Sequence, residues 1–211
     1  NFLEEGADEP QYPRYLDGQE LISSKLISET DFGSKIQYVW TAEELKAMGL
    51  MEGPVFGIEW YSFTDLDDSI SVDLDLSIFD FGFDEFPNGL PFANSGSLGF
   101  SGDWAIKAGV NTIRFNEPYI WDGSSNISIQ LCLKGLDKVD NIFVVSTETE
   151  RVQQILTAST DNITDACNAF VPRNLKQEKP FTAFLQHPGF SDNSDWVNFR
   201  LEESEVSYVV D

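Results

Sequence analysis

One segment of the chain, Ile70 to Ile78, alternates apolar and polar residues without a break. An α-helix repeats about every 3.6 residues and cannot place such a pattern on one face, whereas a β-strand sends successive side chains to opposite faces. The segment is therefore predicted to be an antiparallel strand with a buried aliphatic face and an exposed face of Ser and Asp.

Shorter alternating or apolar runs, separated by turn-forming residues, predict further strands along the chain. They lie at 34–40, 56–60, 111–115, 127–132, 142–145, 182–185, 197–201 and 206–210. Short strands spaced by turn signals are typical of a jelly-roll-like β-sandwich, so the predicted fold class is all-β. Residues 79–102, rich in Phe, Gly, Pro and Asn, are predicted to form a long loop or an irregular edge.

One short helix is predicted near residues 42–48. Thr41 is a suitable N-cap, and Glu44 stands three positions later, as in a capping box. Trp40 and Leu45 occupy the positions of a hydrophobic staple around this cap.

The chain is predicted to be one domain with an extension. Residues 1–18 are acidic and contain Pro10 and Pro13, so we expect an extended N-terminal arm that docks on its own domain or on a neighbour. No linker with a change in composition divides the rest, so residues 19–211 are predicted to form a single β-sandwich domain.

The charge balance restricts the partners. Thirteen Lys and Arg residues face 36 Asp and Glu residues, which gives a formal net charge of −23. Such a surface repels nucleic acid and anionic membranes, and suits divalent cations, basic partners or a salty medium. Solubility alone is an equally good reason for the charge. No stretch approaches the roughly 18 apolar residues of a membrane span, so no membrane insertion is expected.

The chain contains two cysteines, Cys132 and Cys167. They form either a disulfide, which implies an oxidising compartment, or two buried thiols, and the disulfide is the pairing we prefer. The chain begins at Asn1 rather than Met, so it is either processed or trimmed, and processing would fit a secreted or cell-surface protein.

Three segments carry a resemblance to a known family. They are Ser34–Leu50 with its T-A-x-E-L-x-x-x-G-L helix, Gly53–Trp60, and Gly109–Cys132 with its W-D-G-x-S-N turn before a strand ending in Cys. The chain, over residues 34–174, resembles a jelly-roll module that recurs in large secreted and cell-surface bacterial proteins, many of them exported by the type IX route.

The resemblance implies structural roles for the turn residues. Trp121 would fill the core, while Asp122, Gly123 and Asn126 would shape the turn. It also implies adhesion, surface display or proximity to a substrate, usually without catalysis.

A metal site is one candidate function. Asp65, Asp67 and Asp68 place three carboxylates within four residues, and oxygen ligands of this kind suit calcium. The alternative is a solvated turn before the strand at Ile70.

A sugar-binding platform is a second candidate. Trp104 and Trp196 are flanked by polar loop residues, so they are the tryptophans expected to be exposed, and a ring face can stack on a sugar. The alternative is that both belong to the core.

Catalysis is a third candidate. Asp73 and Asp75 lie on one face of the predicted strand, about 7 Å apart, a spacing compatible with glycoside hydrolysis. Any acidic alternating strand also produces this pair. His187, the single histidine, lies in a turn sequence and suits an exposed residue better than a catalytic one.

Together these observations favour a non-catalytic extracellular module for adhesion or surface-structure assembly. Its expected partners are neighbouring protein subunits, including a homo-oligomer formed through the N-terminal arm, or an extracellular polysaccharide. The alternative is a calcium-supported carbohydrate-binding module, followed by a glycoside hydrolase.

Overall fold

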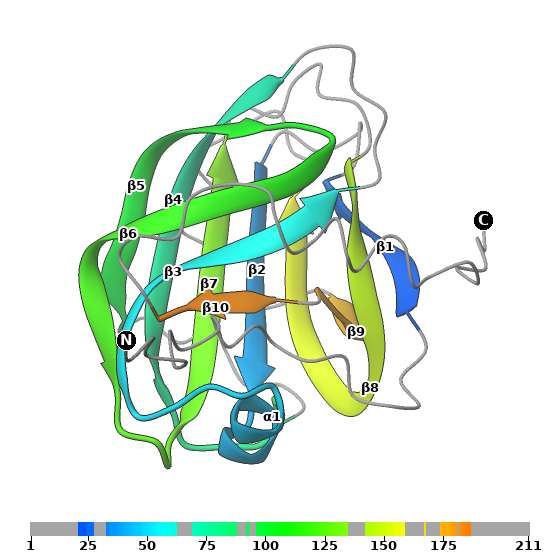
Figure 1. Cartoon of the computed structure of the whole chain (residues 1–211). Helices are drawn as coiled ribbons and strands as arrows, with labels where there is room; N and C mark the ends of the chain where they lie inside the picture. The colour runs from blue at the N-terminus through cyan, green and yellow to red at the C-terminus, as the bar shows by residue number, and fades with distance from the viewer. Residues whose placement is uncertain are drawn as a thin grey trace, which may run out of the picture.

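Antiparallel strands make up most of the fold, so the predicted all-β sandwich is confirmed (Figure 1). The computed structural model describes residues 21–27, 33–62, 69–87, 92, 96–134, 142–158, 167, 174–180 and 182–186. Its elements are β1 (Leu21–Ile27), β2 (Gly33–Trp40), α1 (Ala42–Ala47), β3 (Gly53–Ser62), β4 (Ile70–Phe81), β5 (Ser97–Ile106), β6 (Gly109–Trp121), β7 (Asn126–Lys134), β8 (Ile142–Ala158), β9 (Asn174–Pro180) and β10 (Ala183–Leu185).

The strands form two layers that face each other. The first layer has the order β5-β4-β7-β2-β8, and both β1 and β9 pair with β8. The second layer, β6-β3-β10, crosses in front of the first in Figure 1. One residue pair, Ser62 with Val144, connects β3 to β8, so the layers are continuous at that point.

The main core lies between the two layers. The alternation of β4 is confirmed, because Val72, Leu74 and Leu76 are buried on the core side while Asp73 is exposed on the other. The largest fully buried side chains are tryptophans, including Trp60 from the second layer. Apolar burial of this kind is the main favourable contribution to folding.

Strand β2 is buried on both faces. Ile36 faces the main core, whereas Gln37 and Val39 face the outer side of the first layer and are still fully buried. A second apolar cluster covers part of this outer side and consists of Val39, Phe79, Phe81 and Phe86. The first layer is therefore covered on both sides around β2.

The helix begins with the predicted capping box. Thr41 Oγ1 accepts a hydrogen bond from the Glu44 amide at 3.2 Å, and Glu44 Oε2 accepts one from the Thr41 amide at 2.7 Å. The ammonium of Lys179, on β9, lies 2.8 Å from Glu44 Oε1 and donates to the Val39 carbonyl at 3.0 Å. It also lies 5.4 Å from the centre of the Trp40 ring. The helix is thus held to the first layer by a buried cation.

Several expectations differ from the structure or are not tested by it. The loop expected over 79–102 is wrong at both ends, because β4 continues to Phe81 and β5 begins at Ser97. The sequence pattern also missed β1 and β9. The arm at 1–18 and the strands expected at 197–201 and 206–210 lie outside the described residues. None of the described helical residues forms a helix of the length and apolar character that crossing a membrane requires.

Candidate functional site

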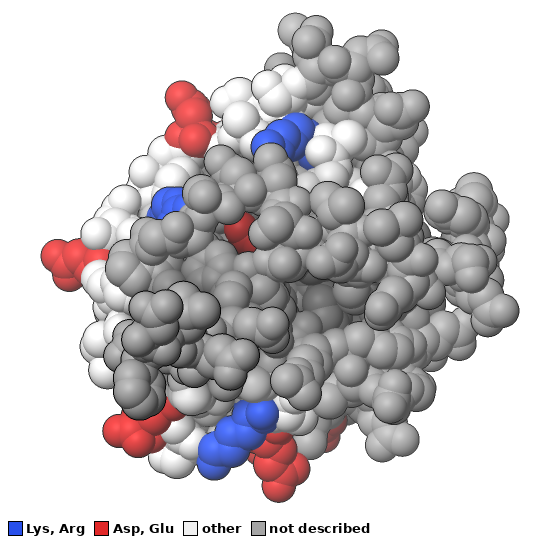
Figure 2. All heavy atoms as spheres, viewed as in Figure 1, with Lys and Arg blue, Asp and Glu red and all other residues white. Residues whose placement is uncertain are grey.

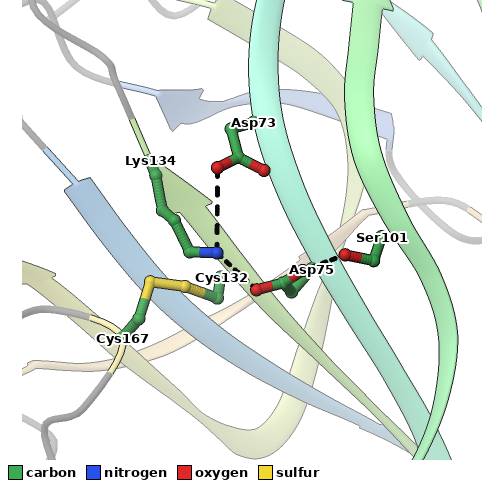
Figure 3. The surroundings of a disulfide bond; sticks show 6 residues. All are labelled: Asp73, Asp75, Ser101, Cys132, Lys134 and Cys167. Carbon is green, nitrogen blue, oxygen red and sulfur yellow. Dashed lines mark hydrogen bonds and ion pairs between the residues drawn. A yellow bond between two sulfur atoms is a disulfide. The ribbon is translucent and has the colours of Figure 1, made fainter. Parts of the chain in front are cut away.

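Charged side chains gather on the outer face of the first layer, where β5, β4 and β7 lie side by side (Figure 3). Lys134 Nζ lies 2.5 Å from Asp75 Oδ2 and 3.8 Å from Asp73 Oδ2. Asp75 Oδ1 accepts a hydrogen bond from Ser101 Oγ at 2.6 Å. The strand register produces this arrangement, because Asp73 lies opposite Lys134 and Asp75 lies opposite Ser101.

Asp75 is held as a carboxylate. Partial burial raises its pKa, but the hydrogen bonds from Lys134 and Ser101 and the charge of Lys134 outweigh burial and leave the pKa below its ordinary value. The hydrogen bond to Asp75 is the main reason that the pKa of Lys134 is raised. A glycosidase needs one carboxyl group with a raised pKa as its acid, and the pKa of Asp75 is shifted in the opposite direction. The geometry is that of a partly exposed ion pair, which contributes at most about 1 kcal/mol to stability.

Strand β5 lies at the edge of this charged face. Within the described part of the chain it pairs with β4 alone. Its exposed side chains at Leu98, Ser101, Asp103 and Ala105 all share the outer face with the polar residues of β4. Asp103 stands directly opposite Asp73, and like charges in that position repel.

The cysteine pair lies beside the charged residues. Cys132 on β7 is opposite Asp75, and its Cα atom is 5.4 Å from that of Cys167, the separation of a disulfide (Figure 3). This distance confirms that Cys132 and Cys167 are placed to form the predicted pair. A disulfide here attaches a distant part of the chain to the outer face of β7.

The middle of the outer face, around β2, is covered. Lys35 is 3% exposed, its ammonium lies 4.9 Å from the centre of the Phe92 ring, and burial lowers its pKa. Gln37 Nε2 donates a hydrogen bond to Ser128 Oγ at 3.0 Å, also buried. Among the described residues of this face, exposed side chains lie on β4 and β5, at Asp73, Ser101 and Asp103.

The turn after β6 is held by hydrogen bonds of its own residues. Trp121 is fully buried, and its indole N–H donates to the Ser125 carbonyl at 2.8 Å. The Asp122 carboxylate accepts three hydrogen bonds of 2.7 Å, from the amides of Ser124 and Ser125 and from the Ser125 hydroxyl. Gly123 has φ +74°, a left-handed conformation that glycine adopts without strain.

Asn126 links this turn to two other segments. Its Oδ1 accepts a hydrogen bond from the Ala42 amide at 2.9 Å, at the start of α1. Its Nδ2 donates to the Phe83 carbonyl at 2.9 Å and to Asp84 Oδ1 at 3.0 Å, beyond the end of β4. Trp121, Asp122 and Asn126 therefore make their hydrogen bonds within the fold, at the end of the sandwich near α1.

The expected exposure of Trp104 is wrong. Its side chain is 5% exposed and packs edge-on against Trp60, with ring centres 5.9 Å apart. Trp104 lies opposite Val72, on the core side of β5. Its polar sequence neighbour Asp103 points to the other face, because successive strand residues alternate. Trp104 is therefore a core residue and presents no ring face to a sugar.

The remaining predicted site residues lie outside the described part of the chain. These are Asp65, Asp67, Asp68, Trp196 and His187. Among the residues that the structure describes, no group of three or more His, Cys, Asp or Glu side chains is arranged to hold a metal ion. Calcium at residues 65–68 stays a prediction.

On the face of the molecule that Figure 2 draws, the acidic side chains of the described residues do not form one patch. Figure 2 shows Asp and Glu side chains projecting at separate places around the described part of this view.

Sequence reasoning missed Asp103 and Lys134, because neither lies in a motif. The one signal was spacing, since Lys134 follows Cys132 by two residues and so shares its strand face.

Comparison with known proteins finds no matching family model, no matching curated protein and no matching solved structure. The likeness to the secreted bacterial jelly-roll module therefore rests on the sequence motifs at 34–174.

Proposed function

We propose that the protein is a non-catalytic extracellular module that acts in adhesion or surface-structure assembly. The observation that carries this proposal is β5, a ten-residue strand that pairs along one edge only within the described residues. An edge of this kind offers backbone N–H and C=O groups to a strand from another chain. Assembly by strand addition is the function that such an edge serves best.

Two further observations support this proposal. The cysteine pair at disulfide distance suits an oxidising, extracellular compartment. The Asp75–Lys134 ion pair, with the pKa of Asp75 lowered, suits a structural role for the acidic strand better than acid catalysis. The carbohydrate-binding alternative is weakened, because Trp104 is buried.

Size-exclusion chromatography with light scattering tests the proposal. The samples are the full chain and a variant lacking residues 1–18, each in calcium and in EDTA, with circular dichroism as the control for folding. We expect the full chain to form assemblies or to bind a neighbouring surface protein. A folded chain that is monomeric in every condition, binds no surface protein and binds a polysaccharide instead would contradict the proposal.

A further inference from the structure

We infer that the edge of β5 that no described strand pairs with accepts an extended basic segment of a partner protein, in preference to a second copy of this chain. The inference rests on strand addition, the mechanism of the proposed function, and adds the chemistry of the partner.

The charges next to the edge are unbalanced. Asp73, Asp75 and Asp103 share the outer face of β4 and β5, and the described cations near them are the partly exposed Lys134 and Lys107, one residue past the end of β5. The Lys134 ammonium lies closest to Asp75, at 2.5 Å, and 3.8 Å from Asp73, whose side chain is 51% exposed. Lys35 lies on the same face but is buried. Asp103 is the outermost of these carboxylates, on the edge strand itself.

An added strand would place a side chain beside Asp103. Residues opposite each other on neighbouring strands have Cβ atoms about 5 Å apart, within reach of a Lys or Arg. A basic residue there would pair with Asp103 and offset its repulsion with Asp73. Charge complementarity at the open edge therefore selects a partner with a cation in this position.

The outer face also restricts the neighbours of that cation. Side chains two residues apart on an added strand lie on the same face. Asp103 is followed on this face by Ala105, whose small side chain leaves room for a large residue on the partner. Toward the other end stands Leu98, which is 53% exposed. The fitting segment therefore alternates basic and apolar residues with residues of any kind between them.

A second copy of this chain fits the edge less well than a basic segment does. In another copy the cation nearest to β5 along the chain is Lys107, one residue past the strand, and an antiparallel pair of β5 strands would bring it opposite Asp103 only in the register that pairs Ala105 with Ala105. Each copy also carries a formal net charge of −23. Charges closer together than the Debye length, about 8 Å at physiological ionic strength, are only partly screened by salt. The approach of a second copy is therefore opposed by net repulsion, whereas a basic segment of another protein is attracted.

The test measures binding of a fluorescent peptide to the full chain by anisotropy. The probe is a fifteen-residue peptide with the repeat Lys-Thr-Val-Thr, so that Lys and Val alternate on one face of the strand and Thr occupies the other face. Asp103→Lys should weaken binding by roughly tenfold, whereas Glu43→Lys, the same charge change on α1, should change it by less than about twofold. Asp103→Asn gives an intermediate loss, and thermal unfolding confirms that each variant is folded.

Two peptide controls separate strand addition from simple charge attraction. A peptide with Glu in place of Lys should not bind. A Lys peptide methylated on alternate backbone nitrogens keeps its charge but loses one row of N–H donors, so it should bind at least about tenfold more weakly. Amide hydrogen exchange should slow in residues 97–106 when the unmodified peptide binds.

The inference is overturned if Glu43→Lys weakens binding as much as Asp103→Lys, or if slowed exchange maps to a strand other than β5. It is also overturned if the chain assembles with itself in light scattering while the Lys peptide does not bind. That last result would contradict the basic partner and leave the proposed function in assembly intact, so the experiment distinguishes the two hypotheses.

Discussion

Replacing Lys179 with Met should destabilise the sandwich, because the substitution removes the cation that holds α1 to the first layer. The Lys179 side chain is 5% exposed and its ammonium contacts Glu44, the Val39 carbonyl and the Trp40 ring. Met has a similar apolar stem, so the packing around the stem is largely kept. The change therefore tests the charge and its hydrogen bonds.

The magnitude follows from the burial of the two partners. Breaking a buried ion pair by removing one partner costs about 3–5 kcal/mol. The Glu44 side chain is 26% exposed and keeps its cap with Thr41, so water and the cap compensate part of this loss. We expect a loss of about 2–3 kcal/mol, which for a chain of this size lowers the melting temperature by roughly 5–10 °C.

The loss should depend on pH through Glu44. Burial raises the pKa of Glu44, but the charge and hydrogen bond of Lys179 and the capping hydrogen bonds of Thr41 bring it below the ordinary value of 4.5. A carboxyl whose pKa is lowered by folding adds stability above its unfolded pKa and loses it as pH falls through the folded pKa. The stability gap between wild type and Lys179→Met should therefore be widest at neutral pH and narrow in acid.

Urea unfolding followed by tryptophan fluorescence, at neutral pH and at about pH 3, measures this gap. Glu44→Gln removes the charge and preserves the capping box, so a double-mutant cycle with Lys179→Met isolates the coupling. A gap of equal size at both pH values, or a cycle without coupling, would refute the reasoning.

Other perturbations test the fold and the turn. Reducing the Cys132–Cys167 pair, 35 residues apart, should lower the free energy of unfolding by about 4 kcal/mol in the chain-entropy model; a denaturation midpoint unchanged by reductant would show that no bond contributes. Trp104→Ala should cost about 3–5 kcal/mol, as for a large core side chain, and a thermal unfolding curve like that of wild type would contradict its burial. Asp122 should stay ionised well below the ordinary pKa of 3.8, because the hydrogen bonds of Ser125 and Ser124 lower its pKa; carboxyl chemical shifts in an NMR titration check this, and titration at the ordinary value would count against the turn.

Local signals explain what the sequence could predict. The capping box of α1 involves residues three positions apart, and the β4 alternation is visible within one segment. In both cases the interactions that decide the structure lie close together along the chain. The turn at Asp122 and Gly123 is short-range as well, and its hydrogen bonds span two or three residues.

Long-range pairing explains what the sequence could not predict. The start of β5 is concealed by Gly99 and Gly102, which are poor strand formers in isolation. Gly102 lies opposite Leu74, and Gly99 lies at a register shift against the side chains of Leu76 and Ile78. The polar neighbours of Trp104 predict an exposed ring, although only the pairing with β4 decides which way its side chain points. The contact of Lys134 with Asp75 depends on the register of β4 and β7, which no local pattern encodes.

The central position of β2 has a consequence for the order of folding. Its partners in the sheet, β7 and β8, begin at Asn126 and Ile142, so most of the chain must be synthesised before either edge of β2 can be paired. Until then an apolar strand with two open edges is exposed to other chains. Contacts between such distant segments also form slowly. The nascent protein should therefore need protection by a chaperone until β8 is available, and a truncation that ends before Ile142 should aggregate.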